Sequence, residues 1–568
     1  MIRRMTIGHK WTGFVAAIGS GLMVAGLFPP FNLWPLVWIA MMPLLWALGK
    51  FQGRRAALKG FGIAYFAGAV SCLIQFNWLT TVSWLGAILL PLYLAIYWGL
   101  FGLFVAWLAQ RSDRNRLTSR VRIAFCHAAI WGGLEWLRGW FITGFAWNQL
   151  GVGFHEVQVF AQAADLLGVT GLSAILVFIQ SLLVQSLTVE TGRPQKWLAF
   201  GLVVLLITAL WGYGKFAIAR EAGKKSVQLK TLLVQLNIPQ VAGRMLWTDL
   251  ETHQAYEDET LAALDRLKTP NGELGKDWPD WVMGPETALT GRILRTKEGA
   301  WGTWQINMDT VSQIRSAGPV TLIYGVNEIE GEGNGSELAE KPGGKYYNSM
   351  AVMSPDNGLQ TFRKHHLVVF GETIPFVETI PLLKKIYEQQ SGMSFGGSFA
   401  AGESLEPVQI LVGNTMVGAI PTICFEDSVG RLTRKFVRRQ PQVLVNVTND
   451  GWFKESPAAA QHFANSRFRA IELRRPMLRC ANTGVSVALN SAGSAFHPTL
   501  GEQILTDSKG SHFTRGTRLT KLEIPLDPTR TFYAFAGDWG ILAVTGLGVL
   551  ASCRGVRNGG SRSAAKDN

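Results

Sequence analysis

Long apolar stretches separated by short polar loops dominate the first 214 residues of the chain. Several of these stretches hold about 20 residues, which is enough for an α-helix to cross a hydrocarbon layer of about 30 Å. The pattern predicts seven membrane helices in this part of the chain and an eighth near the C-terminus. The predicted spans are 12–28, 35–49, 57–76, 84–109, 121–138, 168–190, 197–214 and 535–552.

The first apolar stretch has a second interpretation. It follows the basic segment MIRRMTIGHK, and a basic segment before an apolar run is also typical of a signal peptide. The many apolar stretches that follow favour a first helix that is retained in the mature protein.

The hydropathy pattern changes between about residues 215 and 534. Short β-branched runs at 227–237 and 319–327 predict strands. The segments 248–268 and 461–475 predict helices with one apolar face. Strands that alternate with helices indicate an α/β domain outside the membrane.

The distribution of charge decides what the net charge of +14 means. In the apolar part of the chain and at its two ends, basic residues gather at the N-terminus and in the segments 49–60, 110–122, 191–196 and 553–568, whereas 29–35 and 77–84 contain no Lys or Arg. The positive-inside rule therefore predicts that both termini are cytoplasmic and that the α/β domain lies on the other side. Because no long Lys/Arg run is interleaved with aromatic residues, no nucleic-acid partner is expected.

Two short strings of the α/β domain contain candidate catalytic groups. Glu286 follows the strand-like WVM, and catalytic groups gather at strand ends, although an acid after Pro also suits the start of a helix. Lys364 lies beside an apolar run that leads to Glu372, and a lysine buried near a carboxylate can stabilise developing negative charge. His365 and His366 lack the spacing of zinc ligands, so no metal site is expected.

A third string ends an apolar run with Cys424, which Glu426 and Asp427 follow closely. A thiol attacks as its thiolate, so a nucleophilic role requires a nearby cation or base. Two other interpretations stay open. A single Cys on a strand is often a small buried hydrophobic residue, and an oxidising compartment would permit a disulfide with Cys480.

In chain order, Glu286, Lys364 and Cys424 resemble the catalytic triad of the nitrilase, or carbon–nitrogen hydrolase, superfamily. Further similarity lies in the segments 29–46, 133–151, 234–240, 445–453 and 470–484. With membrane helices on both sides of the α/β domain, the resemblance narrows to one family of that superfamily, the apolipoprotein N-acyltransferases. It extends over nearly the whole chain.

The resemblance implies a membrane α-helical bundle with a nitrilase-like α–β–β–α sandwich. The predicted parts are a seven-helix bundle (1–214), a periplasmic catalytic domain (215–534), a last membrane helix (535–552) and a cytoplasmic basic tail (553–568). It further implies a monomeric, multi-pass enzyme of a bacterial inner membrane that needs no cofactor. The acyl donor would be a phospholipid of the bilayer, and the acceptor a diacylglyceryl apolipoprotein.

The resemblance also implies a role for each residue of the site. Glu286 would be the general base, and Cys424 would carry the acyl group as a thioester. Lys364, with the backbone N–H after Cys424, would hold the oxyanion. Glu372 would support the triad as a second carboxylate, and Glu426 would orient the chain behind the nucleophile.

Trp247 matches the family pattern at the opening of the domain and is expected on a loop near the acyl chain. The sequence departs from the family pattern at Phe425, where Tyr is common, at Val369, where Pro is usual, and at Gly284, where Trp is common. Two alternatives remain: a membrane-tethered amidase that lets water resolve the thioester, and a transporter with a sensing domain. The lack of a visible internal repeat disfavours the transporter.

Overall fold

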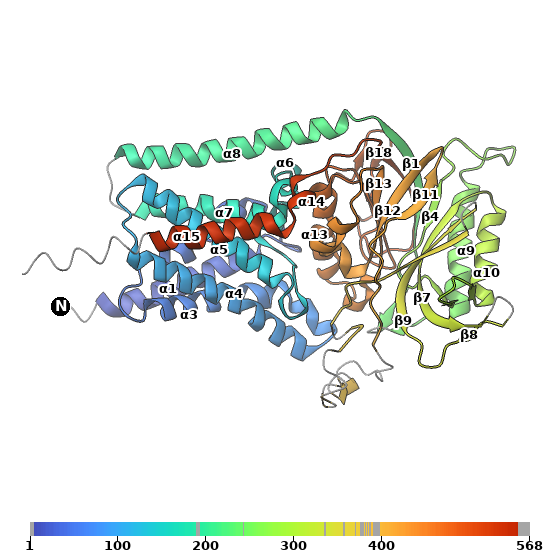
Figure 1. The fold of residues 1–568 in the computed structure, drawn as a ribbon, viewed down its shortest axis with the longest axis horizontal. Helices are drawn as coiled ribbons and strands as arrows, with labels where there is room; N and C mark the ends of the chain where they lie inside the picture. The colour runs from blue at the N-terminus through green and yellow to red at the C-terminus, as the bar shows by residue number, and fades with distance from the viewer. Residues whose placement is uncertain are drawn as a thin grey trace, which may run out of the picture. The chain divides into compact units, whose positions relative to one another are not determined.

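The structure is a computed structural model that describes residues 5–554 except 189–192, 242–243, 334–336, 356–357, 370, 375–379, 381, 383, 386–387 and 390–397. The chain divides into two compact units (Figure 1). The helical unit comprises residues 1–219 and 531–568, and the α/β unit comprises residues 220–530. From residue 555 on, the predicted basic tail lies outside the described residues.

The helical unit is a bundle in which α3 packs on α4 and α1, and α5 packs on α7 and α15. Its α-helices are α1 (Met5–Ala25), α2 (Met42–Leu48), α3 (Ala56–Gln75), α4 (Trp84–Arg111), α5 (Leu117–Arg138), α6 (Gln158–Ala161), α7 (Ala164–Thr188), α8 (Arg193–Ala222), α14 (Phe532–Ala536) and α15 (Asp538–Arg554). Four helical segments in the described part of the chain are long and apolar enough to cross a membrane: Ala56–Gln75, Trp84–Gln110, Ala164–Thr188 and Pro194–Ala222.

The predicted span at 35–49 is apolar and largely helical, but it is not one continuous α-helix. The chain forms a short 3₁₀ helix over Trp34–Trp38 and then the seven-residue helix α2. Pro35 and Pro43 each stand in the first turn of their element, where a residue without an N–H begins a helix well but cannot continue one. The last predicted span is also interrupted, because Gly537 separates α14 from α15 with φ +52°.

Two β-sheets form the centre of the α/β unit. The first has the strand order β10-β9-β7-β4-β1-β18, with β5, β6 and β8 attached, and the second has the order β11-β12-β13-β14-β15. The strands are β1 (Ser226–Gln235), β4 (Trp281–Met283), β5 (Leu289–Arg295), β6 (Trp301–Thr303), β7 (Thr321–Glu332), β8 (Ala339–Glu340), β9 (Tyr346–Ser354), β10 (Gly358–Arg363), β11 (Val408–Val412), β12 (Thr415–Ile423), β13 (Gln442–Thr448), β14 (Met477–Ala481), β15 (Val487–Leu489) and β18 (Gly516–Pro525). The short pairs β2 (Gln240–Val241) with β3 (Arg244–Met245) and β16 (Phe496–His497) with β17 (Gly501–Glu502) lie outside these sheets.

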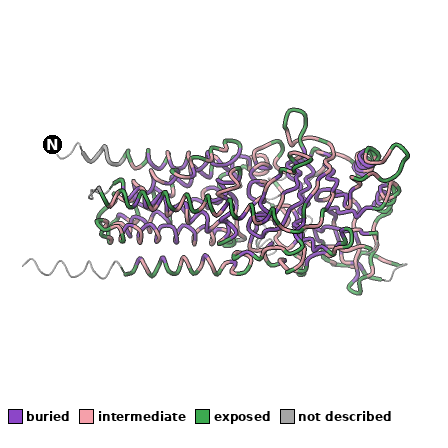
Figure 2. The backbone as a smooth tube through the Cα atoms, turned by 90° about the horizontal axis from the view of Figure 1, so that it is seen from above, coloured by how far each residue is buried: buried purple, intermediate pink, exposed green. Residues whose placement is uncertain are grey.

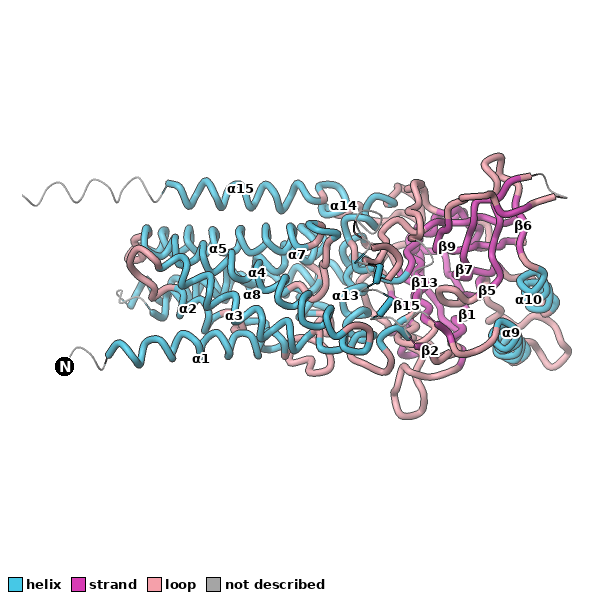
Figure 3. Tube along the Cα trace, turned by 90° about the horizontal axis from the view of Figure 1, so that it is seen from below, coloured by secondary structure: helices cyan, strands magenta, loops and turns pink. Residues whose placement is uncertain are grey.

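The two sheets face each other, and helices cover their outer sides. Cys480 of β14 donates its thiol to the carbonyl oxygens of Val234 and Met283, at 3.3 and 3.2 Å, which joins the second sheet to β1 and β4. The helices α9 (Asp249–Asp265) and α10 (Gln305–Ser316) lie against the first sheet, and α13 (Ala458–Leu473) lies on the side of the second (Figures 1 and 3). The unit is therefore the predicted α–β–β–α sandwich, and strands such as β13 are buried along their whole length. Figure 2 shows the buried parts of the backbone in purple.

Candidate active site

The three residues of the predicted triad stand just beyond three strand ends of the sandwich. Glu286 follows β4 and Lys364 follows β10 in the first sheet, while Cys424 follows β12 in the second. Glu286 and Lys364 are buried, and Cys424 is partly exposed. The prediction that each residue stands at a strand end is confirmed.

Lys364 is held between two carboxylates. Its ammonium nitrogen Nζ lies 2.9 Å from both oxygens of Glu372 and 3.8 Å from Oε1 of Glu286. The Nδ2 group of Asn348 lies 2.7 Å from Glu286 Oε1 and 2.7 Å from Glu372 Oε1. The amide thus bridges two acids that would otherwise repel each other. Asn348 carries no motif of its own on strand β9, and nothing in the sequence singled it out.

Burial and charge set the protonation of this cluster. Burial raises the pKa of Glu286, and Lys364 only partly offsets that effect. Burial alone would lower the pKa of Lys364, but Glu372 and Glu286 raise it above its ordinary value, so the ammonium keeps its charge. Burial would also raise the pKa of Glu372, yet the Lys364 charge outweighs it and lowers that pKa. In this cluster Lys364 is therefore a fixed cation and Glu372 stays ionised. Glu286 is the carboxylate that can take a proton.

The chain turns sharply where strand β12 ends and a 3₁₀ helix (Cys424–Ser428) begins, and Cys424 is the first residue of that helix. Its φ is +53°, a value that costs a non-glycine residue free energy and persists only where the surroundings fix it. Asn446 of the neighbouring strand donates its side-chain amide to the Cys424 carbonyl oxygen at 3.1 Å and helps to hold this turn.

The Cys424 thiol faces the Glu286 carboxylate. Cys424 lies close enough to lower the pKa of Glu286 slightly, and Glu286 Oε2 has no hydrogen-bond partner among the described residues. Burial raises the pKa of Cys424 well above its ordinary value, and the Glu286 charge raises it further. At neutral pH the resting group is a neutral thiol, so its proton must leave during nucleophilic attack.

Glu426 ties the Lys364 segment to the turn that carries Cys424. Its Oε1 accepts the backbone N–H groups of His365 and His366 at 2.7 and 2.8 Å, and its Oε2 accepts the N–H of Ile423 at 2.8 Å. Burial raises the pKa of Glu426 to about 7. These bonds place Glu426 behind the nucleophile, and its role in orienting the turn stays a prediction.

Phe425 and Trp247 differ in how they relate to the triad. The Phe425 ring stacks on the His366 imidazole with centroids 5.7 Å apart, which adds a second link between the two segments. Trp247 lies just before α9 and packs against the core under the first sheet, with the Arg515 guanidinium 5.9 Å from its ring centroid. No contact described for Trp247 involves the triad, so its predicted role near the acyl chain stays a prediction.

A buried charged cluster next to the nucleophile was missed by the sequence interpretation. His462 of α13 places Nε2 2.8 Å from Asp427 Oδ1 and Nδ1 2.7 Å from Asp450 Oδ1. Arg479 of β14 lies 3.3 Å from Asp427 Oδ2 and 3.0 Å from Asp450 Oδ2. Because these four side chains come from four separate segments, their pairing left no local signal.

His462 in this cluster is protonated. A neutral imidazole donates from only one nitrogen, yet both nitrogens of His462 face carboxylate oxygens within 2.8 Å. Burial would lower the pKa of His462 and Arg479 opposes the charge from 2.9 Å, but the two aspartates raise that pKa to about 9. Two cations and two anions then make a neutral, buried group beneath the Cys424 turn.

Among the described residues, no group of three or more His, Cys, Asp or Glu side chains could hold a metal ion. All five cysteines are free, including Cys424 and Cys480, so the alternative of a disulfide between these two is wrong for this structure. The site offers a nucleophile, a base and a fixed cation, which together suit acyl transfer through a covalent intermediate.

Residues 20–182 match the apolipoprotein N-acyltransferase N-terminal domain, and residues 282–517 match the carbon-nitrogen hydrolase domain. An apolipoprotein N-acyltransferase from Agrobacterium fabrum is 30% identical over 517 residues, which cover 86% of this chain and 88% of the relative. The chain belongs to the apolipoprotein N-acyltransferase family. A second relative of that name, from Geobacter metallireducens, is 29% identical over 84% of this chain and 85% of its own.

The membership explains why an acyltransferase has a hydrolase-like domain. The matched carbon-nitrogen hydrolase region contains Glu286, Lys364 and Cys424. A solved carbon-nitrogen hydrolase from Helicobacter pylori aligns with 52% of this chain and 89% of its own, with 12% identity and a TM-score of 0.32, too low a likeness to support an argument. The enzyme is an acyltransferase whose chemistry is built on the superfamily's α/β domain.

Proposed function

We propose that the chain transfers the sn-1 acyl group of a phospholipid to the α-amino group of an N-terminal diacylglyceryl-cysteine on an apolipoprotein. One observation supports this function most directly. The Cys424 thiol lies near the Glu286 carboxylate, and the Lys364 ammonium is held beside them, 2.9 Å from Glu372. Membership in the apolipoprotein N-acyltransferase family supports this choice of substrates.

In the first half-reaction, Glu286 takes the thiol proton while the Cys424 sulfur attacks the ester carbonyl carbon. The negative charge that develops on the carbonyl oxygen is stabilised by the Lys364 ammonium and the backbone N–H of Phe425. A single such donor contributes about 10²–10³ in rate. The tetrahedral intermediate collapses, the carbon–oxygen bond breaks, and the proton on Glu286 passes to the alkoxide of the departing lysophospholipid.

In the second half-reaction, the acceptor amine attacks the thioester carbonyl carbon. Glu286 takes a proton from the attacking nitrogen and returns it to the Cys424 sulfur as the carbon–sulfur bond breaks. The product is an amide, and the free thiol is restored. Because a thioester is already activated toward amines, this step needs no nucleotide.

The proposal includes the topology of the chain in the membrane. The basic loops at 49–60 and 110–122 favour cytoplasmic termini, and the α/β unit would then face the periplasm of a bacterial inner membrane. We retain eight membrane crossings as the proposed topology, in which the shorter apolar helices complement the four long ones. We also propose a monomer, because one chain supplies every residue of the site.

The mass of the intact protein after exposure to phospholipid tests the proposal. Wild-type protein should gain the mass of one acyl chain on the peptide that contains Cys424, and should lose it when a diacylglyceryl-cysteinyl peptide is added. Cys424→Ala should gain none, whereas Cys480→Ser, at a buried cysteine outside the triad, should behave as wild type. Acyl transfer by Cys424→Ala at the wild-type rate would refute the mechanism.

The acceptor product separates this function from the amidase alternative. An acyltransferase places the chain on the peptide amine, whereas a hydrolase releases a free fatty acid. Release of fatty acid with no acylated peptide would favour the amidase.

A further inference from the structure

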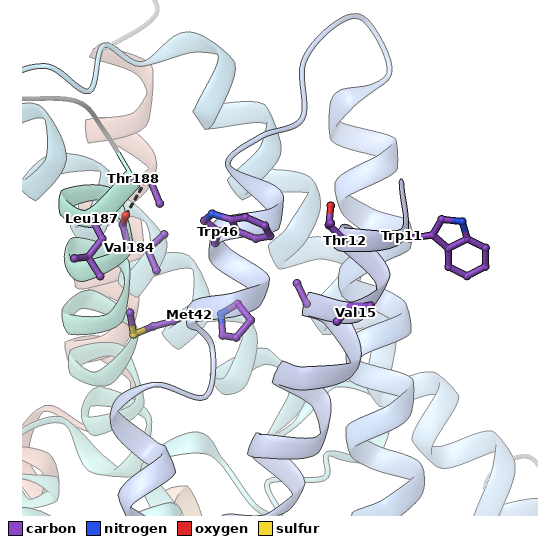
Figure 4. A pocket seen from close by; sticks show the side chains of 10 residues that line it. Trp11, Thr12, Val15, Met42, Trp46, Val184, Leu187 and Thr188 are labelled. Carbon is purple, nitrogen blue, oxygen red and sulfur yellow. Dashed lines mark hydrogen bonds between the residues drawn. The ribbon is translucent and has the colours of Figure 1, made fainter. Parts of the chain in front are cut away.

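An apolar groove opens in the helical unit beside α2, where the segment predicted as the second membrane helix is interrupted. It has a volume of about 670 Å³, and Figure 4 shows its lining side chains. Helix α1 contributes Trp11, Thr12, Val15 and Ala16, α2 contributes Met42, Pro43 and Trp46, and α7 contributes Val184, Leu187 and Thr188. The short helix α2 lies between the longer α1 and α7, so it fills only part of the space between them.

The lining of this groove does not suit water. Thr12 and Thr188 supply the hydroxyl groups of the lining, and Thr188 already donates to the carbonyl oxygen of Val184 at 2.7 Å. A bound water needs two to four polar partners. The exposed fractions of Trp11 and Leu187 are both 69%, so the rim is apolar as well. Hydrocarbon is therefore the material that fits the groove.

Positive charge stands at one end of the groove. Lys50 follows α2 and places its Nζ 3.3 Å from the ring centroid of Trp46, which lines the groove. Arg114 donates to the carbonyl oxygen of Gly49 at 3.2 Å, which brings a second cation to the same helix end. A lysine above a tryptophan at the end of a membrane helix is typical of the region where lipid head groups lie.

We propose that this groove binds one phospholipid, with an acyl chain along α1, α2 and α7 and its phosphate at Lys50 and Arg114. The volume lies within the range of about 300–1,000 Å³ that is common for ligand pockets. The cations select a charged head group, and the apolar lining selects a chain. A diacylglycerol would satisfy only the second of these two features.

Native mass spectrometry of the full-length protein tests this site. After lipid removal in detergent and titration with phosphatidylglycerol, wild type should retain one lipid in addition to any donor bound at the Cys424 site. Ala16→Phe and Val184→Phe, which place a ring in the groove, should each retain one lipid fewer than wild type. Val204→Phe, at an exposed position on α8 outside the groove, should retain as many lipids as wild type. Equal retention by wild type and by both groove variants would overturn the proposal.

The charge of Lys50 gives an independent measurement that does not depend on filling the groove. Lys50→Gln should weaken binding of phosphatidylglycerol about fivefold, the usual effect of one cation near a lipid surface, and should leave binding of diacylglycerol unchanged. Lys59→Gln, at another exposed lysine, is the matched control. Unchanged phosphatidylglycerol affinity in Lys50→Gln, or equal loss for both lipids, would contradict the phosphate contact.

Discussion

The carboxylate of Glu426 accepts the backbone N–H of His365 at 2.7 Å, and through this bond the segment that carries Lys364 is fixed to the segment that carries Cys424. The two segments follow strands of different sheets, so their relative position depends on such links. The second oxygen of Glu426 accepts the N–H of Ile423, directly before the nucleophile. Glu426, together with the stack of Phe425 on His366, thus helps to set the distance between the nucleophile and the cation.

Glu426→Gln should slow formation of the acyl-enzyme about 10²-fold, because displacement of a reacting group by about 1 Å has an effect of that size. The amide keeps one acceptor oxygen but turns an N–H₂ group toward either Ile423 or the His365 segment. The rate at which the acyl mass appears on Cys424 measures the effect. Glu298→Gln, at an exposed loop acid, is the control. A wild-type rate in Glu426→Gln would show that the link is dispensable.

The rate of acyl-enzyme formation should fall at low pH, and Asn348→Leu should move this fall to higher pH. At neutral pH the variant should react about tenfold more slowly than wild type. The hydrogen bond from Asn348 lowers the pKa of Glu286, so its loss raises that pKa. Glu286 accepts a proton only when ionised, and activity is therefore lost as pH falls through its pKa. The pH dependence of the acylation rate measures the shift.

A control for this variant is Asn307→Leu, which removes a buried amide that bonds to Gly291 and Thr303 instead. It should lower stability without moving the fall in rate at low pH. An unchanged fall in Asn348→Leu would show that the amide does not set the protonation of Glu286.

Glu286→Gln should increase the reactivity of Cys424 toward maleimide while it abolishes acyl transfer. The Glu286 charge raises the pKa of Cys424, so its removal lowers that pKa and increases the thiolate fraction at a given pH. Peptide mass mapping after labelling without reductant measures the modification of Cys424. Cys480 is buried and should stay unlabelled in both proteins. Slower labelling in Glu286→Gln would contradict the proposed electrostatics.

The sequence predicted the triad because its residues follow recognisable strands. The predicted strand at 227–237 is β1, and the predicted helices at 248–268 and 461–475 are α9 and α13 with ends shifted by one to three residues. Asn348 and His462 were missed for a shared reason. Their significance comes from partners more than ten residues away, and a polar residue within a strand or helix has no local pattern that reveals such partners.

The interruption within 35–49 was missed for a different reason. A hydropathy count measures how apolar a segment is, but not whether its backbone can continue as a helix. Pro35 and Pro43 begin new elements there, and each prevents the preceding turn from continuing through it. The same segment contributes Trp46 to the groove, so the interruption of the helix and the proposed binding site lie in one part of the chain.

A topology experiment tests the proposed placement of the two units. A reporter fused at Asn115, in a basic loop of the helical unit, should lie in the cytoplasm, because the positive-inside rule retains such loops there. A reporter fused at Glu340, in the α/β unit, should lie in the periplasm. An alkaline phosphatase fusion is active only in the periplasm and reports the difference. Equal activity at both positions would contradict the eight-crossing topology.

His462→Gln should remove a pH-dependent part of the stability of the α/β unit. The pKa of His462 is raised from its ordinary 6.5 to about 9 in the folded protein, so its contribution is complete below about pH 6.5 and is lost as pH rises through about 9. A shift of this size contributes on the order of 3 kcal/mol to the free energy of unfolding.

Denaturant unfolding of the full-length protein measures this contribution. Wild type should lose stability between pH 6.5 and 9, whereas His462→Gln should be less stable at pH 6.5 and should lack that fall. His253→Gln is the control, because burial lowers the pKa of His253 and its contribution has the opposite sign. A fall of the same size in His462→Gln would mean that another group titrates, and that His462 is neutral between Asp427 and Asp450.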